Sequence, residues 1–173
     1  MKATNPDSLL VRRCAVMRPK PGPNPNANRR YRIYYDKDGV PVSVRSTVPF
    51  YEKSFTDEAG YEVLERYYLV FDFEVGGLMA EVTRTWTDVS GEYSFGFVEL
   101  DQLDGEAKEA LLRLIRSGRL EEMRAKVLEA AREALTKIAQ MTDLPSEADS
   151  LEKEVHRIFE QVVKQVVAGV RQA

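Results

Sequence analysis

Hydrophobic and polar residues alternate along the first hundred residues of the chain, and beyond them the pattern changes to a helical period. The clearest alternation places apolar and aromatic side chains on odd positions of 61–75, namely Tyr61, Val63, Tyr67, Leu69, Phe71, Phe73 and Val75. The even positions include the charged residues Glu62, Arg66, Asp72 and Glu74. A period of two with one apolar face is typical of a half-buried antiparallel strand. We therefore predict a central strand over 61–75.

Similar alternation predicts strands before and after this one. They cover residues 9–17, 29–35, 40–48, 78–88 and 93–97. A proline-rich loop at 18–28 precedes the second of them, and Val40, Val42 and Val44 should share one apolar face on the third. We expect a hairpin turn at Asp36–Gly39 and a two-residue turn at Gly76–Gly77. The sequence therefore predicts an antiparallel β-meander of five or six strands.

Beyond Asp104 the apolar residues recur every three or four positions, as in helices. A first helix ends at Ser117-Gly118, and a second carries a narrow apolar seam from Leu120 to Met141. The last, at about 151–170, has a wide stripe rich in valine, a poor helix former that burial must hold in place. Strands followed by about three C-terminal helices predict an α+β fold. We expect one domain overall, with a sheet region at 1–104 and a helical region at 105–173 packed on the sheet or on a partner.

Charge is unevenly distributed along the chain, although the net charge is only −3. Residues 1–50 hold ten Lys/Arg and three Asp/Glu, residues 51–105 hold three and thirteen, and residues 106–173 hold twelve of each. This segregation has two interpretations. Either the blocks form separate binding faces, or neighbouring strands of opposite charge neutralise each other.

The basic block offers the strongest candidate binding surface. Strand alternation places Arg30, Arg32 and Tyr34 on the face opposite Tyr31, Ile33 and Tyr35, and Arg45 should share that outer face. Arg29 lies beside it. Arginines with an exposed tyrosine can hold the phosphates and bases of single-stranded nucleic acid or contact an acidic partner. The alternative is that these arginines pair with Glu62, Glu74 or Glu81 on neighbouring strands.

Patterns that carry catalysis are weak in this sequence. It has no phosphate-binding glycine loop, dinucleotide fingerprint or nucleophile elbow. Glu152, His156 and Glu160 form a helical stripe beside the apolar one, which favours a solvated helix surface over a metal site. The strand acids Asp72, Glu74 and Glu81 are interpreted as charges on a wet face. We predict no catalytic residue, metal ligand or cofactor.

The remaining composition favours a cytoplasmic protein. The one cysteine, Cys14, cannot form an intrachain disulfide, no run of eighteen apolar residues occurs, and charges interrupt the N-terminal segment where a signal peptide would be apolar. We therefore expect a non-enzymatic interaction module or subunit of a larger assembly, which contacts a protein partner or further copies through its helices and an acidic partner through its basic sheet face. One alternative is a nucleic-acid-binding accessory protein that uses strands 29–35 and 40–48. A second alternative is a small enzyme that uses the acidic strand residues.

Overall fold

The computed structural model describes residues 30–87, 90–141 and 148–172 of the chain. In these ranges six strands form one antiparallel sheet and three α-helices follow it, which confirms the predicted α+β class. The strands are β1 (Tyr31–Tyr35), β2 (Pro41–Ser46), β3 (Tyr51–Thr56), β4 (Glu62–Asp72), β5 (Gly77–Trp86) and β6 (Tyr93–Glu99). A short 3-10 turn, η1 (Leu100–Gln102), leads to the helices α2 (Gly105–Arg116), α3 (Arg119–Met141) and α4 (Ala148–Gln172).

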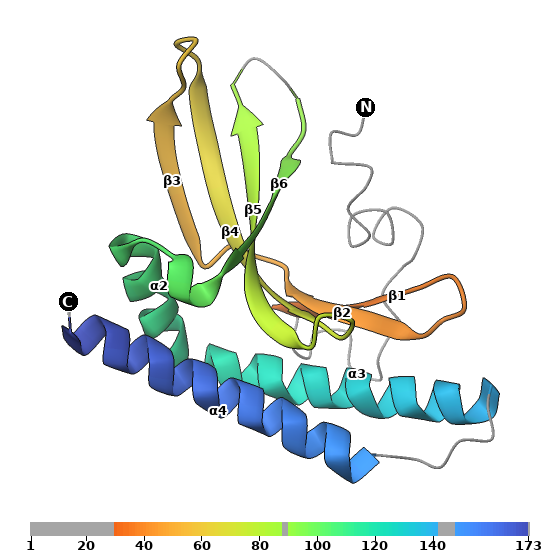
Figure 1. The fold of residues 1–173 in the computed structure, drawn as a ribbon. Helices are drawn as coiled ribbons and strands as arrows, with labels where there is room; N and C mark the ends of the chain where they lie inside the picture. The colour runs from red at the N-terminus through yellow and green to blue at the C-terminus, as the bar shows by residue number, and fades with distance from the viewer. Residues whose placement is uncertain (1–29, 88–89, 142–147, 173) are drawn as a thin grey trace.

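β4 is the central strand, as its aromatic face predicts. β5 pairs with it on one side, while on the other side β3 pairs with its first half and β2 with its second half. β1 lies outside β2, and β6 lies outside β5. In Figure 1 the half of the sheet that contains β3 extends away from the two long helices, whereas β1 and β2 lie over α3. The order is that of a meander except for β3, a strand that the alternation analysis missed, and the strand predicted at 9–17 lies outside the described residues.

Aspartates organise several sharp turns of the sheet, and the sequence analysis predicted a turn at two of them. The Asp36 carboxylate accepts hydrogen bonds from the backbone N–H groups of Asp38 and Val40, at 2.9 and 3.0 Å, in the predicted turn. The predicted two-residue turn at Gly76–Gly77 is wrong, because Asp72 pairs with Gly77 across the hairpin. The connection is longer because the Asp72 side chain accepts from the N–H groups of the two residues after Phe73, at 2.8 and 3.1 Å.

The core lies between the helices and the face of the sheet that they cover, here called the inner face. It includes Ile33, Val44, Leu69 and Phe71 from the strands. From α4, Phe159 stacks on Phe71 with ring centroids 5.9 Å apart. Because Val155, Ile158, Phe159 and Val166 are all buried, the stripe of α4 packs as predicted. Burial of this stripe offsets the low helix propensity of its valines.

The start of α2 and the break between α2 and α3 lie at residues that the sequence identifies. The Asp104 side chain caps α2 by accepting a hydrogen bond from the Ala107 N–H at 2.9 Å. Gly118, with φ of 81°, separates α2 from α3, which confirms the predicted break. No helix within the described ranges is long and apolar enough to span a membrane.

A second apolar cluster lies on the opposite face of the sheet, here called the outer face. Its members are Tyr34, Val42, Val70 and Met79, and all four are buried. A register irregularity at Tyr34/Tyr35 leaves Val42 between the paired residues Pro41 and Ser43. Val42 therefore joins Tyr34, and the expectation that it shares a face with Val44 is wrong.

Candidate functional site

The structure distributes the predicted basic surface over different environments. Arg29 lies outside the described residues, and Arg32 is exposed on β1. Tyr34 is only 6% exposed, because it packs in the outer-face cluster with Val70. The expectation that this tyrosine is available to stack on a base is therefore wrong.

Arg45 is tied into the outer face by a buried partner. Its Nε donates to a Glu81 carboxylate oxygen at 2.7 Å, and Ser94 donates to the other oxygen at 2.9 Å. The guanidinium lies 3.8 Å from the centroid of the Tyr68 ring. Burial alone would lower the pKa of Arg45, but the charge and hydrogen bond of Glu81 outweigh it and raise the pKa. For Arg45 the alternative interpretation, pairing with an acidic strand residue, is confirmed.

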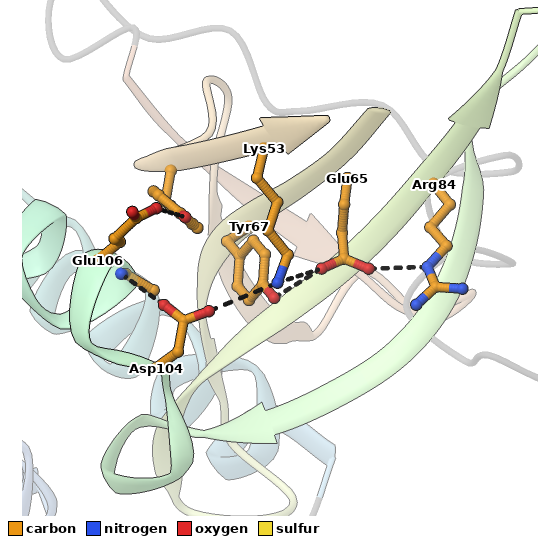
Figure 2. A network of polar contacts seen from close by, with 8 residues as sticks. Lys53, Glu65, Tyr67, Arg84, Asp104 and Glu106 are labelled. Carbon is orange, nitrogen blue, oxygen red and sulfur yellow. Dashed lines mark hydrogen bonds and ion pairs between the residues drawn. The ribbon is translucent and has the colours of Figure 1, made fainter. Parts of the chain in front are cut away.

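Glu65 is the corresponding buried acid on the inner face (Figure 2). Arg84 Nε donates to one carboxylate oxygen at 2.7 Å, and the Tyr67 hydroxyl donates to the other at 2.7 Å. The Lys53 ammonium lies 3.5 Å from the same carboxylate. Burial would raise the pKa of Glu65, but these hydrogen bonds and charges lower it. Glu65 is thus held ionised by groups of its own sheet.

Lys53 also links this network to the start of α2 (Figure 2). Its ammonium lies 3.4 Å from Asp104, the residue that caps the helix. The Tyr51 hydroxyl donates to Glu106 in the first turn of α2 at 2.7 Å. These contacts fix α2 against β3. Many carboxylates of the acidic block thus serve the fold, including Asp72 in its turn and Glu81 beside Arg45.

Arginines gather at a different place, the corner where α2 ends and α3 begins. A pocket of about 340 Å³ opens there against β1 and the β2–β3 connection. Its lining includes three arginines, Arg30, Arg113 and Arg119, and we call it the arginine pocket. The other lining residues are Tyr31, Ser46, Val48, Pro49, Phe50, Ala110, Leu114 and Ser117.

The three arginines differ in their partners. Arg30 donates to both carboxylate oxygens of Glu122 on α3, at 2.9 and 3.0 Å. Arg113 and Arg119 are exposed, and within the described part of the chain no carboxylate forms an ion pair with either. An exposed guanidinium needs no internal partner, and an unpaired one is available to an anion from outside.

The apolar lining gives the arginine pocket a second chemical character. Phe50 and Leu114 are partly buried and pack against the core, and Tyr31 is almost fully buried beside them. Burial first, and then the charge of Glu122, raises the pKa of Tyr31, so its phenol stays neutral. A pocket lined by both arginines and apolar side chains suits a ligand that carries an anionic group next to an apolar group.

The sequence contains a signal for this pocket that the strand-based interpretation passed over. Arg113, Arg116 and Arg119 recur every three residues in the segment RLIRSGRL. Because Gly118 lets α3 start directly after α2, Arg113 and Arg119 reach the same corner. Arg30 is far from these residues in the sequence, and the folding of the chain brings it to the same pocket.

The stripe of Glu152, His156 and Glu160 lies against arginines of α3. Glu152 pairs with Arg132 at 2.6 Å, and Glu160 pairs with Arg124 at 3.2 Å. An Arg124 nitrogen also lies 3.4 Å from Nδ1 of His156. The stripe therefore connects the two long helices.

Comparisons of the chain with protein-family models, with curated proteins and with solved structures find no match.

Proposed function

We propose that this protein is a non-enzymatic interaction module that binds an acidic segment of a protein partner in the arginine pocket. The observation that carries the proposal is the pair of exposed arginines, Arg113 and Arg119, which line one pocket and have no acidic partner in the described residues. Such guanidiniums attract a carboxylate or phosphate. The single cysteine fits a reducing, cytoplasmic setting for this interaction.

Two observations favour an acidic protein segment over nucleic acid as the partner. The arginine face predicted on strands 29–35 and 40–48 lacks an exposed tyrosine, and its Arg45 is engaged with Glu81. Single-stranded nucleic acid needs an extended groove with stacking rings, whereas two of the free arginines, Arg113 and Arg119, lie around one pocket with aliphatic and aromatic lining. A peptide that places an acidic side chain beside an apolar one fits this lining.

The helices contribute to binding through this corner. The apolar stripe of α4 is buried against the sheet and the other helices, so it supports the fold. The junction of α2 and α3 instead presents charged side chains to solvent. We therefore place the partner contact at the α2–α3 junction.

Fluorescence anisotropy with a labelled peptide of alternating Glu and Leu residues tests the proposal. The wild-type chain should bind this peptide and should not bind the matched Gln/Leu peptide. The double variant Arg113→Ala/Arg119→Ala should weaken binding about fivefold to thirtyfold, because two exposed charge contacts contribute about 0.5–1 kcal/mol each. Arg157→Gln, an exposed change on α4 that removes one charge instead of two, is a control for net charge and should bind like the wild type.

Three outcomes would contradict the proposal. One is equal binding of the Glu/Leu and Gln/Leu peptides. Another is a loss of binding free energy in Arg157→Gln about half that of the double variant, which would mean that net charge alone attracts the peptide. The third is displacement of the peptide by an unlabelled single-stranded oligonucleotide at lower concentrations than by the unlabelled peptide, which would favour the nucleic-acid alternative.

A further inference from the structure

We propose, building on the proposed function, that the anionic group bound in the arginine pocket is a phosphate monoester on a phosphorylated side chain of the partner. The first argument is the charge of the pocket. Glu122 neutralises Arg30 through two hydrogen bonds, which leaves the charges of Arg113 and Arg119. Two positive charges match a phosphate monoester, which carries about −1.5 to −2 at pH 7, better than a carboxylate, which carries −1.

The second argument concerns the backbone groups at the same corner. The C-terminal carbonyls of a helix usually repel an anion. Here the Arg113 and Ile115 carbonyls accept from the N–H groups of Ser117 and Gly118, at 3.0 and 3.1 Å. The Ser117 hydroxyl donates a hydrogen bond to the Leu114 carbonyl oxygen at 2.8 Å. The carbonyls at the end of α2 are therefore largely satisfied internally and do not meet an incoming anion unpaired.

The apolar lining of the pocket favours a phosphorylated side chain over free phosphate as the ligand. Phe50, Pro49 and Leu114 provide apolar lining that a phosphate ion does not contact favourably. A pocket of about 340 Å³ has room for a phosphate and an adjacent apolar residue of a peptide. The guanidinium forks of the arginines can each donate two parallel hydrogen bonds to phosphate oxygens. The ligand is thus a phosphorylated residue followed or preceded by an apolar one.

Glu122 gives this inference a specific signature. Its carboxylate holds the lining residue Arg30 at 2.9 Å, so its negative charge repels an incoming anion and it engages one arginine of the pocket. Removing its charge with Glu122→Gln should release Arg30 and strengthen phosphopeptide binding by about threefold to tenfold. Glu129→Gln, farther along α3 and paired with Lys126, removes the same charge elsewhere and should leave affinity nearly unchanged.

The experiment uses three labelled peptides that differ at one position, which is phosphoserine, glutamate or alanine beside the same leucines. The full chain should bind the phosphoserine peptide about tenfold more tightly than the glutamate peptide, and the alanine peptide weakest, at pH 7.5. Lowering the pH to 5.5 should reduce the preference, because the second phosphate pKa is near 6. Arg113→Lys/Arg119→Lys, which keeps the charge but removes the planar forks, should lose most of the preference for phosphoserine.

The outcomes distinguish this inference from the proposed function. Equal affinity for the phosphoserine and glutamate peptides, with weak binding of alanine, would overturn the phosphate inference and leave the acidic-segment module intact. Equal affinity for all three peptides would overturn both. If inorganic phosphate displaces the phosphoserine peptide as effectively as the unlabelled phosphopeptide does, the pocket selects the ion alone, and the phosphorylated side chain is overturned as its ligand.

Discussion

Arg45 on the outer sheet face and the two free arginines of the arginine pocket have identical side-chain chemistry but opposite surroundings. Arg45 is 16% exposed and meets a Glu81 carboxylate that is 1% exposed. Arg113 and Arg119 are exposed and have no carboxylate partner within the described ranges. A charge taken out of water requires a partner, whereas a charge left in water does not. The difference teaches that position in the basic block does not identify the arginines available for binding, because Arg45 of that block is engaged with a buried acid.

The same comparison explains the uneven charge along the chain. The acidic block contains Glu65 and Glu81, one buried on each face of the sheet, and each is paired with an arginine of a strand in the same sheet. The partly exposed Glu92 is also held by the sheet, since Tyr68 and Thr83 donate to it at 2.8 and 2.7 Å. Part of the segregated charge therefore stabilises the sheet.

Breaking the buried ion pair between Arg45 and Glu81 should lower the stability of the fold more than the other changes described below. Arg45→Met leaves Glu81 buried without its cation, and we expect the free energy of unfolding to fall by about 3–5 kcal/mol. Urea denaturation followed by circular dichroism measures this change. The double variant Arg45→Met/Glu81→Leu should recover most of the loss, because no buried charge is left unpaired. A single variant as stable as the wild type would refute the structural role of Arg45.

Replacing Glu65, the buried acid on the inner face, should lower the free energy of unfolding by a smaller amount that depends on pH. The folded state lowers the pKa of Glu65 from the ordinary value of 4.5, so its stabilisation is complete above pH 4.5 and is lost as the pH falls through the folded-state pKa. Glu65→Gln should reduce stability by about 1–3 kcal/mol at pH 7. The gap to the wild type should narrow below pH 4.5 in denaturation curves.

A control for this pH effect is available in the turn between β3 and β4. Glu58 is exposed there, so Glu58→Gln removes one carboxylate without touching the network. Its stability should follow that of the wild type across the pH range. A gap for Glu65→Gln that stays constant down to pH 3 would contradict the role of ionised Glu65.

Much of the fold can be predicted from the hydrophobic pattern. A strand buries every second residue and a helix buries every third or fourth, so the spacing of apolar residues distinguishes the two. The strand β3 was missed because the charged residue Lys53 occupies an inward-facing position, where its ammonium forms ion pairs with Glu65 and Asp104. The burial of Tyr34 was also missed. Its signal lies in Tyr68 and Val70, which occupy even positions of β4 between the charged residues.

The candidate site was less accessible from the sequence. The sequence shows the regular spacing of Arg113, Arg116 and Arg119, but this spacing does not tell which arginines form ion pairs with carboxylates. Which arginines stay free depends on contacts between residues far apart in the chain, such as Arg45 with Glu81 and Arg30 with Glu122. Only the folded chain separates these groups.

The arginine pocket should give the smallest effect on stability. Arg113→Ala/Arg119→Ala removes two exposed side chains that form no ion pair with another described residue, so the unfolding free energy should change by no more than about 0.5 kcal/mol. Thermal and urea denaturation measure this change. A loss comparable to that of Arg45→Met would mean that these arginines support the fold, and the comparison between the two regions would fail.

Nuclear magnetic resonance of the arginine side chains tests the contrast between paired and free arginines most directly. The Nε–H groups of Arg45 and Arg84 donate to buried carboxylates at 2.7 Å, so their protons should exchange slowly with water in the free protein. Those of Arg113 and Arg119 should exchange fast, and should slow and shift when the Glu/Leu peptide is added. Slow exchange of Arg113 and Arg119 before any peptide is added, or peptide-induced shifts confined to Arg45 and Arg84, would contradict the account.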